Sequence, residues 1–212
     1  MSRPRYEVDP AVVEHALRLP DVLSTLFAVR DGDDRTAASE SAIAITQVAA
    51  RKPDVVWPYR DMVNQGMRSP YDRVRRESID TLAHLFKVDP VAISTNLPRL
   101  SYVIKHDPDL VVRNHAIDAV TEYGQLTTSA GRRVSPILMR AVDAWDGKNA
   151  YRALTGVYWL LPALHDEYPA INALARRYEH DRRDSVARIA GALVVLTDED
   201  QSMWGNGWLD GE

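Results

Sequence analysis

The chain of 212 residues contains no cysteine, and this absence excludes disulfide bonds, thiolate nucleophiles and cysteine-ligated metal sites. Long apolar runs are also missing. The longest, over 157–164 and 189–196, are interrupted by Pro162 and Gly191 and are far too short to cross a bilayer. The first residues are polar and charged, so we expect no signal peptide. We therefore predict a cytoplasmic protein with no membrane partner.

A strong excess of one charge is missing as well. The chain has 26 basic and 30 acidic side chains, and the acidic excess lies in residues 198–212, which hold five carboxylates and no base. Residues 1–197 are thus close to neutral. This balance argues against a general polyanion binder, although it permits a local basic stripe.

Motifs for catalysis or cofactor binding are absent from the sequence. No two of the six histidines lie three or four residues apart, as a helical metal site would need. Loops starting at Asp31 and Asp198 lack the glycine and glutamate of a calcium loop. There is no phosphate-binding loop, dinucleotide fingerprint or nucleophile elbow. The sequence therefore predicts a protein that is not an enzyme and has no cofactor and no metal.

Two residue types recur along the chain with one period. An arginine stands in similar surroundings at Arg35, Arg75, Arg113, Arg152 and Arg188, at intervals of 36 to 40 residues. A proline precedes an apolar segment at 58, 98, 136 and 169, with similar intervals. Because the two series are independent, their shared period indicates a repeat array.

Each period has the pattern of two helices. Ile79, Leu82, Ala83 and Phe86 follow a spacing of i, i+3, i+4 and i+7, which places them on one helical face. The partner segments Val91–Ile104 and Val134–Trp145 are also helical in pattern, and a proline is favourable in the first turn of a helix, where its missing N–H would have no partner. For counting charge, the second helices are taken as 54–68, 90–105, 128–145 and 168–180. Turn or cap residues separate the segments, and no alternating strand pattern is present.

The phrase Asp-x-x-Val-Arg-x-x-Ala/Ser-Ile-x-x-Leu, followed by a short loop and a proline-led helix, resembles HEAT or armadillo-type repeats. The resemblance extends over about Asp33 to Leu196 and is clearest in Ser69–Lys105 and His106–Val142. It implies an all-α, right-handed α-solenoid of four to five HEAT-like helical hairpins. We expect residues 1–32 to form a helical pair (Pro10–Leu19 and Asp21–Arg30) that caps the array, 33–196 to form the repeats, and 197–212 to form an acidic tail.

Two expectations concern packing. The recurring arginines are expected to bond acidic or carbonyl groups of a neighbouring repeat, near Asp72, Asp109 and Asp184, rather than to form a nucleic-acid track. Trp145 and Trp159, the latter beside Leu160 and Leu161, are expected in the core or between repeats.

In such solenoids the second helices line the concave face, where partners usually bind. Large side chains able to make directional contacts on these helices are the candidate partner-binding residues: Tyr59, Arg60, Asn64, Arg99, Tyr102, Arg133, Arg140, Arg176 and Arg177. We predict a non-catalytic protein-binding adaptor or scaffold whose partner is another protein.

The alternative is a nucleic-acid-binding or alkylated-DNA-repair solenoid similar to helical-repeat DNA glycosylases. Trp57 and Asp61 have a spacing that would place a stacking ring and a carboxylate on one helical face. However, the second helices total +5 and the first helices +4, so neither face is selectively basic. Nucleic acid is not the favoured partner.

The tail holds Trp204 and Trp208 among acidic residues. These tryptophans are expected either to cover the apolar flank of the last helix or to anchor a partner. Both roles stay open, and capping is preferred.

Overall fold

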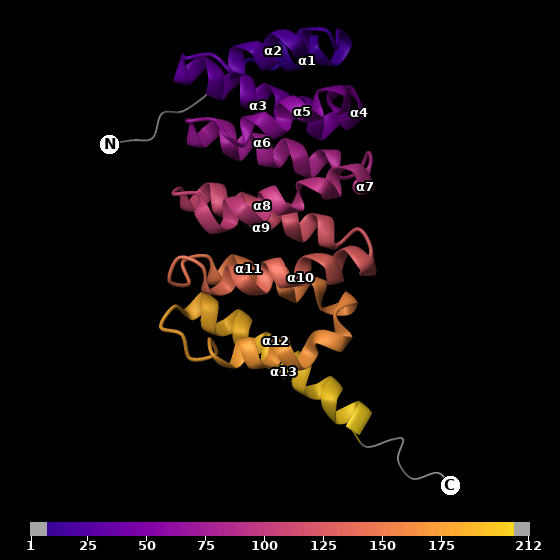
Figure 1. The fold of residues 1–212 in the computed structure, drawn as a ribbon, viewed down its shortest axis with the longest axis vertical. Coiled ribbons are helices and arrows are strands. Elements are labelled where there is room, and N and C mark those ends of the chain that lie inside the picture. Colours follow the sequence, from indigo (N-terminus) through magenta and orange to yellow (C-terminus); the bar gives the residue numbers. More distant parts are fainter. Residues whose placement is uncertain (1–7, 206–212) are drawn as a thin grey trace. The chain divides into compact units, whose positions relative to one another are not determined.

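A computed structural model describes residues 8–205, with the side chains described from residue 8 to 198. These residues form an all-α structure in which no strand occurs (Figure 1). The chain divides into two compact units, Met1–Ala119 and Val120–Glu212. Helix α9 contains the last residues of the first unit and the first residues of the second.

Unit 1 starts with two short helices that both contact α3. Helix α3 lies between α2 and α6, and α6 also packs against α5 (Figure 1). Its elements are α1 (Pro10–Arg18), α2 (Val22–Arg30), α3 (Arg35–Arg51), α4 (Pro53–Val56), η1 (Trp57–Tyr59), α5 (Arg60–Gly66), α6 (Asp72–Leu85), α7 (Pro90–Ile93), η2 (Ser94–Asn96), α8 (Leu97–His106) and α9 (Leu110–Gly124).

Unit 2 consists of the end of α9 and two further helical pairs. Helix α10 packs against α11, α12 packs against α13, and α11 also contacts α13. The elements are α10 (Thr128–Asp143), α11 (Ala150–Leu160), η3 (Leu161–Ala163), η4 (His165–Glu167), α12 (Tyr168–Arg176) and α13 (Asp184–Gly205). Helix α13 thus continues through residues 197–205 of the segment considered a tail.

Aspartate side chains fix the starts of several helices. Asp34 accepts hydrogen bonds from the backbone N–H groups of Thr36 and Ala37, and Asp109 accepts them from Val111 and Val112. The first N–H groups of a helix have no intrahelical acceptor, so such caps are stabilising. The aspartates that the sequence places before apolar segments therefore determine where α3 and α9 begin.

Three of the four periodic prolines lie in the first turn of a helical segment. Pro58 lies in the first turn of η1, Pro98 in that of α8 and Pro169 in that of α12. The expectation for Pro136 is wrong, because Pro136 lies inside α10. The reason is an earlier start: the Thr127 hydroxyl accepts a hydrogen bond from the Ala130 N–H at 3.0 Å and caps the helix more than two turns before the proline.

Arg75 and Arg113 make equivalent contacts 38 residues apart. In each, one guanidinium nitrogen, Nη1, donates to two successive carbonyls in the turn before its helix. Arg75 bonds Ser69 and Pro70 at 3.0 and 3.3 Å, and Arg113 bonds Asp107 and Pro108 at 2.7 and 3.2 Å. These carbonyls have no helical partner, so the arginines satisfy them.

Asp107 joins the two arginines. Its carboxylate accepts Nε and Nη2 of Arg75 at 2.7 and 3.0 Å, while its backbone carbonyl accepts Arg113. Both Asp107 and Arg113 are buried. Burial lowers the pKa of Arg113, and the nearby Asp107 and Asp109 oppose this shift. The structural role expected for the arginine series is therefore seen at these two positions.

Arg35 also meets the expectation, through an acidic residue of the next period of the sequence, whereas Arg152 and Arg188 are exposed. Arg35 forms an exposed ion pair with Asp72 at 2.8 Å, which links α3 to α6. Arg188 is exposed on α13. Near the start of that helix, Arg183 instead donates to the Gly147 carbonyl at 2.7 Å. The sequence period therefore identified the arginine in this last element incorrectly.

The expectation that Trp159 is buried, in the core or between repeats, is wrong. Leu160 and Leu161 are buried, but Trp159 is 59% exposed. One residue of helix turns a side chain by about 100°, so Trp159 points away from the face that its neighbours bury. Trp145 is 38% exposed and has a φ of 54°, in a turn where Asp146 and Gly147 also have positive φ.

Two glycines permit close packing in unit 2. A Cβ atom on Gly156 of α11 would lie 2.5 Å from Thr121 Oγ1 and 3.2 Å from Leu138 Cδ1, and one on Gly124 would lie 2.7 Å from Val134 Cγ2. The helices that meet here can approach only because both residues lack a side chain. Gly156 is thus a packing residue.

We expect Arg75→Ala to destabilise the protein by about 3–5 kcal/mol, because it leaves the buried Asp107 carboxylate without its partner. Arg113→Ala should cost about 1–3 kcal/mol through its two orphaned carbonyls. Thermal unfolding measures both effects, at about 2–4 °C per kcal/mol. Arg188→Ala is the exposed control and should leave the melting temperature unchanged. Equal melting of all three variants would refute the structural role.

A second prediction compares two helical glycines. Gly156→Ala should destabilise unit 2 by about 1–3 kcal/mol, because the methyl group overlaps Thr121 in a packed interior. At Gly191 in α13, an added Cβ atom would have no neighbouring atom within 4 Å. Gly191→Ala should therefore stabilise the protein by up to about 1 kcal/mol through helix propensity. Chemical denaturation distinguishes the opposite signs. A stabilised Gly156→Ala protein would contradict the packing argument.

Candidate binding surface on the second helices

The candidate residues of unit 1 near α5 are held by internal contacts. The Tyr59 ring stacks on Phe27 of α2, with ring centroids 5.2 Å apart. The Arg60 guanidinium lies over the Trp57 ring at 5.2 Å and donates to the Trp57 carbonyl. Asn64 is half-buried. These side chains therefore act mainly in packing α5 and the turn before it.

The candidates on α8 divide into one internal and one exposed side chain. Arg99 donates from Nη2 to the Met67 carbonyl at 3.3 Å, which fastens α8 to the end of α5. Its guanidinium also lies 5.2 Å from the centre of the Tyr102 ring. Tyr102 is 53% exposed and stacks on His106, with centroids 4.2 Å apart. Tyr102 is thus the most accessible aromatic candidate of unit 1.

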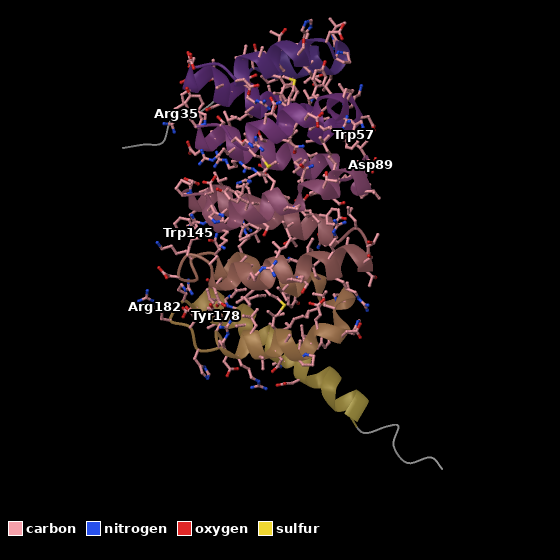
Figure 2. The ribbon with its side chains drawn as sticks, in the orientation of Figure 1. Arg35, Trp57, Asp89, Trp145, Tyr178 and Arg182 are labelled. Atoms are coloured by element: carbon pink, nitrogen blue, oxygen red, sulfur yellow. The ribbon has the colours of Figure 1, made fainter. Side chains whose placement is uncertain are left out.

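The pair Trp57 and Asp61, considered for lesion recognition, does not form an open stacking site. Arg60 lies over the Trp57 ring, and a guanidinium in this position would repel a cationic base brought to that ring face. Figure 2 shows Trp57 at the edge of unit 1 opposite Arg35. The ring therefore lies at the far end of α3 from the arginine that begins it.

In unit 2, α10 and α12 form an open groove of about 420 Å³. Two of the nine candidates lie on its walls, Arg140 from α10 and Arg177 from the residue that caps the end of α12. The remaining lining residues are Met139, Asp143, Ala170, Ala173 and Leu174. Except for the two arginines and Asp143, this lining is apolar. The groove combines an apolar floor with positive charge at its border.

A hydrogen-bonded group fixes one end of the groove. Arg177 Nη2 donates to Asp143 Oδ2 at 2.9 Å, and the Tyr178 hydroxyl donates to Asp143 Oδ1. Burial opposes ionisation of Asp143, but the bonds from Tyr178 and Arg177 outweigh it and lower the pKa of this carboxyl. Burial together with the Asp143 bond raises the pKa of Tyr178 to about 12. Asp143 is therefore ionised and already paired at neutral pH.

Arg140 is different, since it is exposed and forms no ion pair with the part of unit 2 that the structure describes. Arg133, seven residues earlier on α10, is also exposed. Residues seven apart share a helical face. At the groove itself, the arginine that has no ion pair with a described carboxylate is thus Arg140.

Arg176 does not reach the groove. It bonds Asn172 through Nε at 2.8 Å and Asp198 of α13 through Nη2 at 2.6 Å. Asn172 also donates to Asp198 and to the buried Thr197. Arg176 therefore holds α13 against α12, although it was predicted to be a partner-binding residue in the same way as Arg177.

Sequence reasoning missed Met139, Asp143, Ala173 and Tyr178. The signal that could have found Ala173 is its spacing from Ala170 and Arg177, which places all three on one face of α12. Asp143 and Tyr178 lie 35 residues apart and have no local signal. Tyr178 lies at the same edge of unit 2 as Trp145 (Figure 2).

The tail candidates cannot be placed in this surface. Trp208 lies outside the described residues, and for Trp204 the structure describes only its helical backbone at the end of α13. Among the described side chains, no three histidine, aspartate or glutamate residues gather as a metal site requires. None of the described helices has the length and apolarity that a bilayer crossing demands.

In a titration followed by phenolate absorbance, we expect one tyrosine to ionise with a pKa of about 12. This titration step should be absent from the Tyr178→Phe variant. Because the folded pKa is above the unfolded one, the contribution of Tyr178 to stability is present below pH 10 and is lost as the pH rises through about 12. Asp143→Asn should lower this pKa towards its ordinary value. An unchanged titration in Tyr178→Phe would contradict the assignment.

Comparison with known proteins gives a structural likeness alone. No family model matches the chain, and no curated protein matches it in sequence. Among solved structures, an engineered protein determined as a target of the Northeast Structural Genomics Consortium matches with a TM-score of 0.58 and 14% identity. The match covers 95% of this chain and 90% of that one. At this identity the likeness shows that the chain shares an all-α fold with that protein.

Proposed function

We propose that this protein is a non-catalytic, cytoplasmic adaptor or scaffold, a right-handed HEAT-like α-solenoid that binds another protein through its second helices. The observation that supports this most is the groove between α10 and α12, where an apolar floor lies beside Arg140, an arginine that pairs with none of the side chains that the structure describes. Apolar contact area next to a directional, charged group is typical of protein-binding hot spots.

The distribution of the arginines also supports the proposal. Arg75, Arg99, Arg113 and Arg176 are used within the protein, three of them for backbone carbonyls and one for α13. The positive charge left for a ligand is therefore local. A continuous track along a nucleic-acid backbone needs several free cations in succession, and the described second helices of unit 1 supply few.

The proposal is tested by capture from a native lysate of the source organism, with the full-length chain as bait. We expect a protein that stays bound after nuclease treatment and when salt rises from about 50 to about 200 mM. Mass spectrometry identifies it. Recovery of nucleic acid alone, released by the same rise in salt, would refute the adaptor and favour the nucleic-acid-binding or repair alternative.

A variant of the full chain determines whether the C-terminal tryptophans take part. Truncation before Asp198 is unsuitable, because this residue bonds α12. Trp204→Ala combined with Trp208→Ala retains those bonds. If the captured protein is lost with this double variant at unchanged melting temperature, the tryptophans are partner anchors. If capture is unchanged, binding depends on the solenoid surface.

A further inference from the structure

We infer that the groove between α10 and α12 binds a short amphipathic, acidic helical segment of the partner protein. This inference rests on the proposed adaptor function and names the chemistry of the partner. The groove holds about 420 Å³, which lies in the range of pockets that receive a few side chains. Because it is open to solvent, a small molecule would stay largely exposed, whereas a peptide helix would cover the groove.

The floor determines the apolar face of the segment. Ala170 and Ala173 of α12 are exposed, and their small side chains let a helix backbone approach closely. Met139 adds a flexible apolar wall that adapts to different shapes. A ligand helix with apolar residues at i, i+3 or i+4 and i+7 suits this floor.

The charges determine the flanking residues. Asp143 is already satisfied by Arg177 and Tyr178, so it neither attracts a basic ligand strongly nor remains free to repel an acidic one. Arg140, on the same helix as Asp143, is exposed and unpaired within the described part of the chain. Arg177 retains donors beyond the one given to Asp143. The guanidinium of Arg140 and the remaining donors of Arg177, beside an apolar floor, favour carboxylates beside apolar anchors.

The test uses a phage-displayed library of random peptides of about 16 residues, long enough to form a helix on binding. The full-length protein is the bait, and selected peptides are synthesised with fluorescein and measured by fluorescence anisotropy. We expect selected sequences with apolar residues at helical spacing and flanking Asp or Glu. Arg140→Glu removes the free cation and Ala173→Trp fills the floor, so each should weaken binding about tenfold or more.

Matched controls separate this site from other surfaces. Arg188→Glu makes the same charge change on exposed α13, and Ala11→Trp places the same large side chain on exposed α1. Both should bind the peptides like the wild type, and all four variants should retain the wild-type melting temperature. Replacing the flanking carboxylates of a peptide with lysine should restore its binding to Arg140→Glu.

Three results would overturn the inference. The first is that no peptide is selected, and the second is that basic peptides are selected. The third is that the peptides bind the Arg140→Glu and Ala173→Trp variants with unchanged affinity. Labelled duplex DNA that binds through Arg140 and competes with the peptides would also overturn it. If a protein captured from lysate binds both groove variants normally, the adaptor function stands and the groove assignment fails. If lysate yields nucleic acid alone, the adaptor function fails too.

Discussion

Asp107 connects two arginines, and the end of unit 1 is arranged around it. Its carboxylate pairs with Arg75 on α6, and its carbonyl accepts Arg113 on α9. A buried guanidinium must find acceptors, and the carbonyls of a helix-to-helix turn must find donors. Here the guanidinium groups donate to Asp107 and to the carbonyls of the turns, so donors and acceptors are satisfied together. The turns are therefore fixed by arginines that lie one period apart in the sequence.

The use of arginine inside the protein determines what its surface offers. Arg99 and Arg176, which a residue count would assign to the binding face, bond Met67 and Asp198 instead. In the groove between α10 and α12, Arg140 has no ion pair with any side chain of residues 8–198 and lies beside an apolar floor. This combination of local charge and apolar area fits recognition of a protein segment better than recognition of a phosphate backbone.

Local signals predicted most of the helices. Aspartate caps before α3 and α9 and the early prolines of α8 and α12 follow from backbone chemistry that acts within one turn. Pro136 was misplaced because a stronger local signal, the Thr127 cap, starts α10 earlier. The binding candidates were predicted less well. Residue type and helical face do not reveal whether an arginine is bonded to a group 22 or 32 residues away, as Arg176 and Arg99 are.

The sequence by itself determined that this chain is helical, where most helices begin, and that Arg75 and Arg113 have one role. These properties follow from local hydrogen bonding and from a period that repeats the same surroundings. Only the tertiary structure decided that Trp159 is exposed, that Gly156 is needed for close packing, and that Arg140 and Arg177 border one groove. Those properties depend on which helix faces meet, and this is set by side-chain packing between segments distant in the sequence.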